Sequence, residues 1–256
     1  MRFEAKKSLG QNFLIDNNIC QKIVSALEIA SGDNVIEVGP GRGALTRYIS
    51  SSGGRVTALE KDMSLCFFLR EQFPDVDVVC VDALAFDWTR SGRLQRLRIT
   101  GNLPYNIASR ILWDIASRTD GFQKAVFMVQ KEVGRRIVAL PGSKQYGALS
   151  VWMQSFLKPE LLFQVPPGVF RPRPKVDSVV LSFQTIAHKK NIFSSRKLSK
   201  TLKLMFQKRR KQLGNILRTY WNDELNCFFK NQDIDIRSRP EDLSPRDFQR
   251  LSEILF

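Results

Sequence analysis

Apolar residues in the first half of the chain alternate between short continuous runs and stripes at helical spacing. The runs are rich in Val, Ile and Leu and have the pattern of buried strands; they lie at 35–38, 55–59, 76–81, 97–99 and 122–129. Between them, apolar residues three and four apart predict helices after Asp16 and at 63–73, 108–118 and 131–140. Strands alternating with helices predict an α/β fold with a largely parallel sheet.

The pattern changes after the turn at Pro141-Gly142. A packed helix is expected at 146–156, and two strands, 161–165 and 176–183, follow without a helix between them, which favours an antiparallel pair. From 185 onwards only helical spacing remains, and Ser244 with Pro245 begins a last helix that ends near Leu255. We therefore expect two domains, an α/β domain at 1–184 and a small α-helical domain at 185–256.

Polar or glycine residues stand at the ends of four consecutive predicted strands. A turn containing Gly39 and Gly41 follows the first strand, and Glu60, Asp82 and Asn102 end the next three. Each carboxylate by itself would be read as a helix cap or a solvated charge. The carboxyl ends of parallel strands share one edge of a sheet, where α/β proteins bind ligands, so the series predicts a nucleotide-like ligand. Glu60 would accept hydrogen bonds from ribose hydroxyls, and Asp82 would read an adenine amine.

Two ligands fit this edge. Gly39, Gly41 and Ala44 satisfy the dinucleotide fingerprint, so a nicotinamide-dependent enzyme is one reading. Hydride chemistry needs an acid or base, however, and the only histidine, His188, lies in a polar basic stretch. The other ligand is S-adenosylmethionine, whose methionine tail requires no pyrophosphate cradle. We favour S-adenosylmethionine because of the chemistry of the next motif.

The stretch Thr100–Tyr105 suits an exocyclic amine on an aromatic ring. Asn102 offers an amide oxygen, and Leu103 offers a carbonyl that Pro104 holds in extended backbone. Two acceptors on the amine N–H groups would localise the nitrogen lone pair and stabilise the transition state of its methylation. Tyr105 offers a ring on which a base can stack. The simpler reading of these residues is a turn.

The charge balance points to a polyanionic partner. The chain has 40 Lys+Arg against 25 Asp+Glu, a net charge of +15, within an ordinary globular composition of 43% hydrophobic residues. No acidic residue occurs from 178 to 222, where there are eleven Lys and Arg. Nucleic acid is the best match. An anionic membrane is second, although no apolar run is long enough to span one.

The proline-rich loop at 165–175 combines one aromatic side chain with cations. Phe170 would close over a flipped base opposite Tyr105, while Arg171, Arg173 and Lys175 would meet phosphates. The alternative is a connector stiffened by its prolines, with Phe170 filling the edge of the core.

The cysteines and the N-terminus indicate the compartment. Cys20, Cys66, Cys80 and Cys227 have no paired spacing, so we expect reduced thiols that fill the core of a cytoplasmic protein. With one histidine and no cysteine cluster we expect no metal site. The first residues lack the apolar core of a signal peptide.

Five motifs in this order resemble the rRNA adenine N6-dimethyltransferases over nearly the whole chain. They are Gly10-Gln11-Asn12-Phe13-Leu14, Glu37-Val38-Gly39-Pro40-Gly41-Arg42-Gly43, Asn102-Leu103-Pro104-Tyr105, Phe170-Arg171-Pro172-Arg173-Pro174-Lys175-Val176-Asp177-Ser178, and Arg209-Arg210-Lys211 with Asn215-Ile216-Leu217. The resemblance implies a Rossmann-like class I methyltransferase fold. It also implies roles for single residues: Asn12, Leu14, Gly39, Glu60, Asp82 and Asn102 would line the S-adenosylmethionine pocket, and Asn102, Tyr105 and Phe170 would hold the target adenine.

The same resemblance implies a substrate. Enzymes of the small-subunit type dimethylate two adjacent adenosines in a hairpin near the 3′ end of 16S rRNA, within an immature small ribosomal subunit. We expect a monomer with no membrane partner. Two alternatives stay open: a large-subunit rRNA methyltransferase of the macrolide-resistance type, and a non-catalytic RNA-binding assembly factor.

Overall fold

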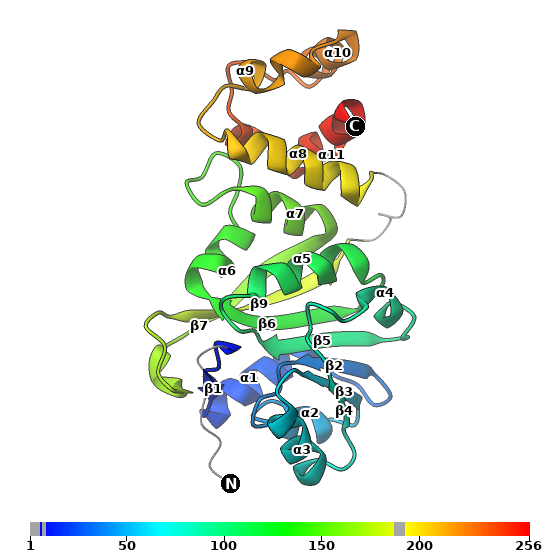
Figure 1. The fold of residues 1–256 in the computed structure, drawn as a ribbon, viewed down its shortest axis with the longest axis vertical. Helices are drawn as coiled ribbons and strands as arrows, with labels where there is room; N and C mark the ends of the chain where they lie inside the picture. Colours follow the sequence, from blue (N-terminus) through cyan, green and yellow to red (C-terminus); the bar gives the residue numbers. More distant parts are fainter. Residues whose placement is uncertain (1–5, 7–8, 187–192) are drawn as a thin grey trace. The chain divides into compact units, whose positions relative to one another are not determined.

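The contacts of the chain divide it into two compact units (Figure 1). The computed structural model describes residues 6, 9–186 and 193–256, so His188 lies outside the described residues. The first unit comprises 1–134 and 158–185, and the second comprises 135–157 and 186–256. Residues 135–157, which we expected within 1–184, thus group with the C-terminal helices. We expected 1–184 to be the catalytic methyltransferase domain and 185–256 to be a basic rRNA-binding domain, and this assignment stays a prediction.

A seven-stranded sheet forms the centre of the first unit. Its strands are β2 (Asn34–Val38), β3 (Arg55–Glu60), β4 (Asp77–Cys80), β5 (Leu97–Asn102), β6 (Lys124–Gln130), β7 (Leu157–Val165) and β9 (Ser178–Thr185). They lie in the order β4-β3-β2-β5-β6-β9-β7. The pairs β4/β3, β3/β2, β2/β5 and β5/β6 are parallel, and β9 is antiparallel to β6. The α/β prediction is confirmed, and β7 and β9 are neighbours in the sheet, as expected for the last two strands.

The helices that the apolar spacing predicted are present after Asp16 and within 63–73, 108–118 and 131–140, whereas two short helices at 46–50 and 88–91 were not predicted from that spacing. In chain order these helices are α1 (Asn17–Leu27), α2 (Thr46–Ser50), α3 (Met63–Gln72), α4 (Trp88–Ser91), α5 (Ala108–Arg118) and α6 (Lys131–Ile137). Asp16 caps α1 by accepting a hydrogen bond from the backbone N–H of Ile19 at 3.0 Å, as its place in the sequence predicted. Asp62 caps α3 in the same way through Ser64 at 3.1 Å.

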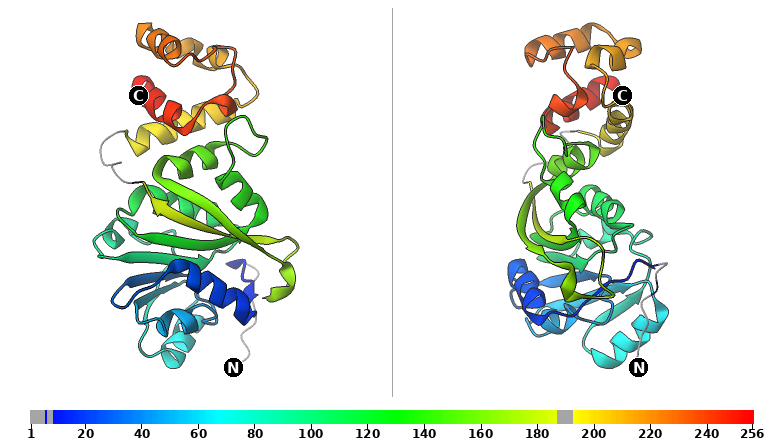
Figure 2. Two further views of the ribbon diagram at one scale, coloured as in Figure 1. Left: turned by 180° about the vertical axis from the view of Figure 1, so that it is seen from behind. Right: turned by 90° about the vertical axis from the view of Figure 1, so that its left-hand side faces the viewer.

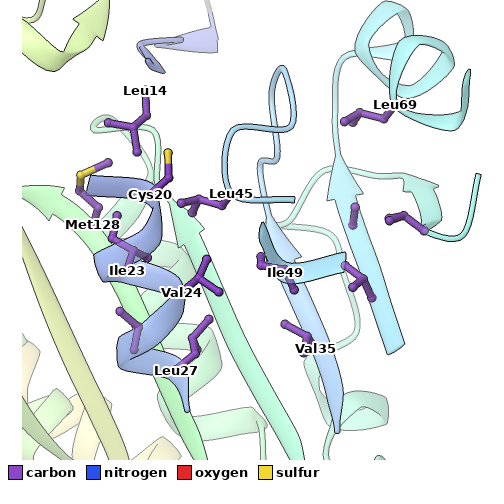
Figure 3. Packing of buried hydrophobic residues seen from close by; sticks show 14 of the residues in the cluster. Leu14, Cys20, Ile23, Val24, Leu27, Val35, Leu45, Ile49, Leu69 and Met128 are labelled. Carbon is purple, nitrogen blue, oxygen red and sulfur yellow. The ribbon is translucent and has the colours of Figure 1, made fainter. Parts of the chain in front are cut away.

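One hydrophobic cluster joins helices α1, α2 and α3 to a single face of the sheet (Figure 3). Ile23 and Leu27 of α1 and Ile49 of α2 are fully buried in it. Val35 faces this cluster, whereas Ile36 points to the opposite face because successive strand residues alternate. Figure 1 shows α5 on that opposite side, and its buried residues complete a three-layer arrangement.

The register of the sheet places the polar strand ends in one row. Glu60 is level with Cys80, Val38 is level with Leu59, and Asn102 is level with Met128. Along the edge the order is therefore Asp82, Glu60, Gly39 and Asn102. The motifs that follow four separate strands are brought to the same edge by parallel pairing alone.

A short two-stranded sheet lies beside this edge. It pairs β1 (Phe13–Leu14) antiparallel with β8 (Phe170–Arg171), and the two segments lie side by side although they are far apart in sequence (Figure 2). The backbone N–H of Ile15 donates to the Val169 carbonyl at 2.9 Å and extends the pairing.

The second unit is helical. Its helices are α7 (Ala148–Phe156), α8 (Ser195–Gln207), α9 (Leu213–Leu217), α10 (Asp223–Asn231) and α11 (Pro245–Leu255). Helices α8 and α11 pack together, with the Phe206 and Phe248 rings stacked at 5.5 Å between centroids. Ser244 caps α11 and Pro245 is its first residue, as expected. None of the described helices is long and apolar enough to cross a membrane.

The prediction that every cysteine fills the core is wrong for two of the four. Cys20 and Cys66 are buried, but Cys80 and Cys227 are exposed. Cys80 is the last residue of the edge strand β4. Cys227 lies on α10, where the residues three and four positions away, Asp223, Glu224, Lys230 and Asn231, are polar.

Candidate active site

A pocket opens at the polar edge of the sheet, within the first unit. Every residue that the sequence assigned to the site lines it, except Phe170. The lining residues are Leu9, Gly10, Gln11, Asn12, Phe13, Leu14, Glu37, Val38, Gly39, Pro40, Gly41, Arg42, Ala44, Leu45, Leu59, Glu60, Lys61, Val81, Asp82, Ala83, Leu84, Asn102, Leu103, Pro104, Tyr105, Asn106, Ile107 and Ile111.

The amide of Asn102 has a defined orientation. Its Nδ2 donates to the backbone carbonyl of Asn12 at 2.9 Å. The side-chain Nδ2 of Asn12 in turn donates to the Gly10 carbonyl at 3.3 Å. Because the N–H side of the Asn102 amide is used by the N-terminal segment, its Oδ1 is left as an acceptor, and within the described part of the chain nothing donates to it.

A second acceptor lies next to the first. The Leu103 side chain is buried and its backbone N–H donates to Met128 at 3.1 Å, which continues the pairing of β5 with β6. Its carbonyl oxygen accepts no hydrogen bond from any residue that the structure describes. The next carbonyl, that of Pro104, is taken up by the N–H groups of Ile107 and Ala108 at the start of α5. Asn102 and Leu103 therefore each keep one oxygen that accepts no hydrogen bond from the described residues, and their joint grip on an amine stays a prediction.

The ring of Tyr105 is held by its hydroxyl group. The Tyr105 and Ser178 hydroxyl oxygens are 2.8 Å apart, and Ser178 is fully buried at the start of β9. Partial burial raises the pKa of Tyr105, so the phenol stays neutral. Sequence reasoning noted Ser178 only as the last residue of a motif. The contact with Ser178 holds the hydroxyl end of the Tyr105 ring, which lines the same pocket as Asn102 and Leu103.

Glu60 joins the glycine-rich turn to the end of β3. Its Oε1 accepts from the N–H groups of Lys61 and Asp62, both at 2.9 Å, and its Oε2 accepts from Gly41 at 3.1 Å. Burial raises the pKa of Glu60, and these three backbone donors oppose that effect. A carboxylate oxygen accepts about two hydrogen bonds, so Oε2 retains capacity for one further donor such as a hydroxyl.

Asp82 is held ionised at the neighbouring strand end. The hydrogen bond from Lys61, with Nζ 2.8 Å from Oδ2, is the main cause that lowers the pKa of Asp82. Its Oδ1 accepts from the backbone N–H of Leu84 at 2.9 Å. These contacts fix the carboxylate at the pocket wall, where it was expected.

Glu37 is a pocket residue that the sequence reading did not single out. It is 1% exposed and accepts a hydrogen bond from the Thr46 hydroxyl at 2.6 Å. Burial raises its pKa to about 7, and the nearby Glu60 adds to the rise. The sequence did contain a sign of this site, because Glu37 is a charged residue within an otherwise apolar, buried strand.

Residues 9–14 line the pocket, and together with Lys6 we call them the strap. Lys6 Nζ is 2.8 Å from Asp62 Oδ1, and Gln11 Nε2 donates to Asp62 Oδ2 at 3.4 Å. The hydrogen bond from Lys6 contributes most to lowering the pKa of Asp62 against the effect of burial. At its other end the strap is held by the β1/β8 pair. The strap thus carries Asn12 and Leu14 to the wall of the pocket.

The expected role of Phe170 does not fit this conformation. Its side chain is 2% exposed, packs in the core cluster and pairs in β8 with Leu14, so the ring is not available to stack on a base. The alternative reading of Phe170, a side chain at the core edge, describes its position. The burial follows from strand pairing between distant segments, which sequence reading could not foresee. Arg171, Arg173 and Lys175 are exposed, as phosphate contacts require.

No group of three or more potential metal ligands occurs among the described residues. The site is instead built from acceptor oxygens, an aromatic ring and a glycine-rich turn. Gly41 has φ of +59°, and a Cβ added there would lie 3.0 Å from the Phe13 ring. Gly39, with φ of +67°, is less crowded, because the nearest atom to an added Cβ is the Asn102 carbonyl oxygen at 4.0 Å, so the turn is open at this residue.

Comparison with known proteins agrees with this chemistry. The model of the ribosomal RNA adenine dimethylase family matches residues 2–256. The chain belongs to this family. Among its relatives, ribosomal RNA small subunit methyltransferase A of Nitratidesulfovibrio vulgaris (strain Hildenborough) is 50% identical over 97% of this chain and 96% of the relative. The protein of the same name from Maridesulfovibrio salexigens is 47% identical over 98% of this chain and 95% of the relative.

Solved structures show the same fold. A dimethyladenosine transferase from Plasmodium falciparum matches with a TM-score of 0.77 and 25% identity, over 93% of this chain and 95% of that one. The 23S rRNA methyltransferase ErmE matches with a TM-score of 0.70 and 24% identity, over 95% of this chain and 99% of that one. This family member is a Rossmann-like, S-adenosylmethionine-dependent rRNA adenine dimethyltransferase.

The site residues fit S-adenosylmethionine. The open glycine-rich turn, the free acceptor capacity at Oε2 of Glu60 and the ionised Asp82 match the hydroxyl and amine donors of an adenosine. In this dimethyltransferase Asn12, Leu14, Gly39, Gly41, Glu60, Asp82 and Asn102 would hold the methyl donor.

Proposed function

We propose that the protein transfers methyl groups from S-adenosylmethionine to the N6 amines of two adjacent adenosines in a hairpin near the 3′ end of 16S rRNA, in the immature small ribosomal subunit. It would act in the cytoplasm, as a monomer. The observation that carries the proposal is the pair of unoccupied acceptors, Asn102 Oδ1 and the Leu103 carbonyl, beside the ring of Tyr105.

The two acceptors would act directly on the target amine. The lone pair of an aromatic amine is delocalised into its ring, so the nitrogen is a weak nucleophile. Acceptance of both N–H groups by Asn102 and Leu103 favours a pyramidal nitrogen with a localised lone pair, which is stabilisation concentrated in the transition state. The sulfonium donor supplies an electrophilic methyl group. The methylated cation is acidic and loses its proton easily, so the site requires no general base.

Tyr105 would hold the base after it leaves its stack. Splaying out a nucleotide costs about a few kcal/mol. Stacking on an aromatic side chain returns roughly 1–3 kcal/mol for each base. The hydroxyl contact with Ser178 fixes the ring in advance, so little side-chain freedom is lost on binding. Phe170 would contribute a second ring only after β8 separates from β1.

The small-subunit substrate is favoured over the large-subunit alternative by the curated relatives. The relatives at 50% and 47% identity carry the small-subunit name. The 23S rRNA enzyme is 24% identical, and a similarity at that level supports a shared fold but not a shared substrate. Arg210 and Lys211 in the second unit and Arg171 in the first supply cations for rRNA phosphates.

Mass spectrometry of rRNA tests the proposal. Immature small subunits, mature small subunits and large subunits would each be incubated with the protein and isotope-labelled methyl donor. We expect two dimethylated adenosines in 16S rRNA of the immature subunits. Label confined to large-subunit rRNA would establish the resistance-type activity instead, and absence of label together with tight subunit binding would favour a binding-only assembly factor.

A further inference from the structure

Two of the four cysteines lie on neighbouring elements next to the pocket. Cys66 is on α3 and is 1% exposed, whereas Cys80 ends β4 and is open to solvent. Helix α3 packs against β4, and Figure 1 shows the two elements side by side. Chemistry between two thiols requires contact between the sulfurs and access for a reagent.

The alternation of side chains along β4 directs Cys80 towards α3. Val78 belongs to the same hydrophobic cluster as Cys66 and Leu69 of α3, and Cys80 is two residues further along the strand. Residues two apart on a strand project from the same face. The Cys80 thiol therefore lies on the α3 side of the sheet, where it is hydrogen-bonded to the Cys66 thiol.

Both cysteines also converge on the backbone of Glu60. The Cys66 thiol donates to the Glu60 carbonyl at 3.5 Å. Cys80 is the register partner of Glu60 in the β3/β4 pair, and the N–H of Val81 donates to the same carbonyl at 2.8 Å. The two sulfurs are thus held where β3 and β4 end, between the pocket residues Glu60 and Asp82.

The surroundings give the two thiols different reactivity. Burial raises the pKa of Cys66, and the neighbouring Cys80 thiol adds to the rise, so Cys66 stays a neutral thiol at neutral pH. Cys80 is reached by solvent and therefore by small oxidants. An accessible thiol that reacts first, in contact with a protected thiol that can resolve it, is the arrangement of a redox-sensitive cysteine pair.

We propose that Cys66 and Cys80 form a dithiol site that a peroxide oxidises to a reversible disulfide, and that this disulfide weakens binding of the methyl donor. The Cys80 sulfur attacks a peroxide oxygen, the O–O bond breaks, and a sulfenic acid and one water form. The Cys66 sulfur then attacks the Cys80 sulfur, the S–O bond breaks and a second water leaves. The two thiols together lose two electrons, which reduce one peroxide to two waters, and an external dithiol reverses the change by exchange.

The disulfide alters the pocket at two strand ends. Bonded sulfurs lie about 2.05 Å apart, closer than any contact between thiols, so α3 and the end of β4 must move together. The S–H group that donates to the Glu60 carbonyl is also lost. The expected effect on the donor rests on the roles proposed above for Glu60 and Asp82, whereas formation of the disulfide does not.

Peptide mapping under non-reducing conditions tests the disulfide. Trypsin cuts after Lys61, Arg70 and Arg90, which places Cys66 in peptide 62–70 and Cys80 in peptide 71–90. After treatment with hydrogen peroxide and alkylation of the remaining thiols, we expect these two peptides to be linked, and a dithiol reductant to separate them. Separate peptides, with Cys80 carried on to the sulfinic acid, would overturn the site.

Cysteine variants test the order of the two steps. Cys227→Ser removes the exposed thiol on α10 and is the matched control, in which the same link should form. Cys80→Ser should abolish the link and leave the buried Cys66 reduced. Cys66→Ser, or Cys66→Ala if the buried hydroxyl prevents folding, should leave Cys80 as a sulfenic acid that a dimedone probe captures. Oxidation of Cys66 in Cys80→Ser at the wild-type rate would contradict first attack by Cys80.

Calorimetric titration with S-adenosylmethionine tests the effect on the pocket. Oxidation of the wild type should weaken binding about tenfold, and the dithiol reductant should restore it. Peroxide also oxidises exposed methionines, and Met63 is 63% exposed on the same helix as Cys66. Cys80→Ser retains Met63, so its affinity should not change under the same treatment. Equal affinities of the oxidised and reduced wild type would overturn the effect on the donor.

Failure of this inference is separable from failure of the proposed function. The peptide mapping requires neither methyl donor nor rRNA. If the reduced protein methylates 16S rRNA and the two peptides never link, only the dithiol site is wrong. If the reduced protein does not bind S-adenosylmethionine, the proposed roles of the pocket residues are wrong, and the mapping still decides whether the disulfide forms.

Discussion

The amide of Asn102 supports amine methylation in only one of its two orientations. The hydrogen bond from its Nδ2 to the Asn12 carbonyl selects the orientation that leaves Oδ1 open. The position of the Tyr105 ring is fixed in a similar way, by the hydrogen bond between its hydroxyl group and that of Ser178. At the scale of single residues, the site therefore depends on groups that do not themselves touch the substrate.

Replacing Asn102 by Ala should lower single-turnover methyl transfer on the order of 10²–10³-fold, because one preorganised acceptor is lost from the transition state. Retention of rRNA, measured by filter binding, should change little. Asn12→Ala is a useful companion variant, since it keeps the backbone carbonyl that orients Asn102. Turnover of Asn102→Ala close to that of the wild type would rule out the amine-gripping role.

Glu37 predicts a pH dependence of stability. Burial raises its pKa to about 7 in the folded protein, from 4.5 ordinarily. Between these values the folded state binds more protons than the unfolded state, so the free energy of unfolding falls as pH rises from about 4.5 to about 7, by roughly 3 kcal/mol at most.

Glu37→Gln removes this titration. In thermal melts between pH 5 and 8, the melting temperature of the variant should depend less on pH than that of the wild type. Glu60 remains in the variant and accounts for part of the pH dependence that is left. The exposed Glu71→Gln is the matched control and should follow the wild type. A Glu37→Gln profile as steep as that of the control would show that Glu37 is not the group responsible.

At the scale of elements, the site depends on close pairing of β5 with β2 and on the strap. Gly101 lies one residue before Asn102, and a Cβ there would be 2.4 Å from the Val38 carbonyl oxygen. Any larger residue must separate the two strands that carry the glycine-rich turn and the amide.

Gly101→Ala should therefore lose about 1–3 kcal/mol of stability through overpacking. Gly168→Ala is its control, because a Cβ at Gly168 has no heavy atom within 4 Å. Chemical denaturation would compare the two variants. If both unfold at the same denaturant concentration, the close approach of β5 to β2 is not limiting.

The strap predicts a selective effect on the methyl donor. Lys6→Met removes the ion pair with Asp62, in which Lys6 is half-exposed. Exposed pairs contribute about 0.2–1 kcal/mol, so the KM for S-adenosylmethionine should rise roughly 1.5- to 5-fold while kcat changes little. Steady-state kinetics at saturating rRNA measures both. A fall in kcat with unchanged KM would place the effect of the strap on the chemical step.

At the scale of the whole molecule, we expect the net charge of +15 to dominate the affinity for rRNA. If about 6–10 phosphates are contacted, affinity for the subunit should weaken about 10³–10⁵-fold between roughly 50 and 200 mM salt. Fluorescence titration over this range gives the slope directly. A nearly flat dependence would mean that recognition is not carried by phosphate contacts.

The sequence by itself determined the alternation of strands and helices and the row of Gly39, Glu60, Asp82 and Asn102. Both are local properties, because side-chain periodicity reports burial and parallel pairing brings all strand ends to one edge. The caps Asp16, Asp62 and Ser244 were likewise readable, since a cap acts within three residues.

Only the tertiary structure decided which partners three of the side chains have, and therefore which way they face. Phe170 became a core residue through pairing with Leu14, Asn102 was oriented by Asn12, and Arg209 turned inward to Glu241. Each of these contacts joins residues far apart in sequence. Local pattern reports the periodicity of burial along one element, whereas the partner of a side chain depends on which distant segment packs against it.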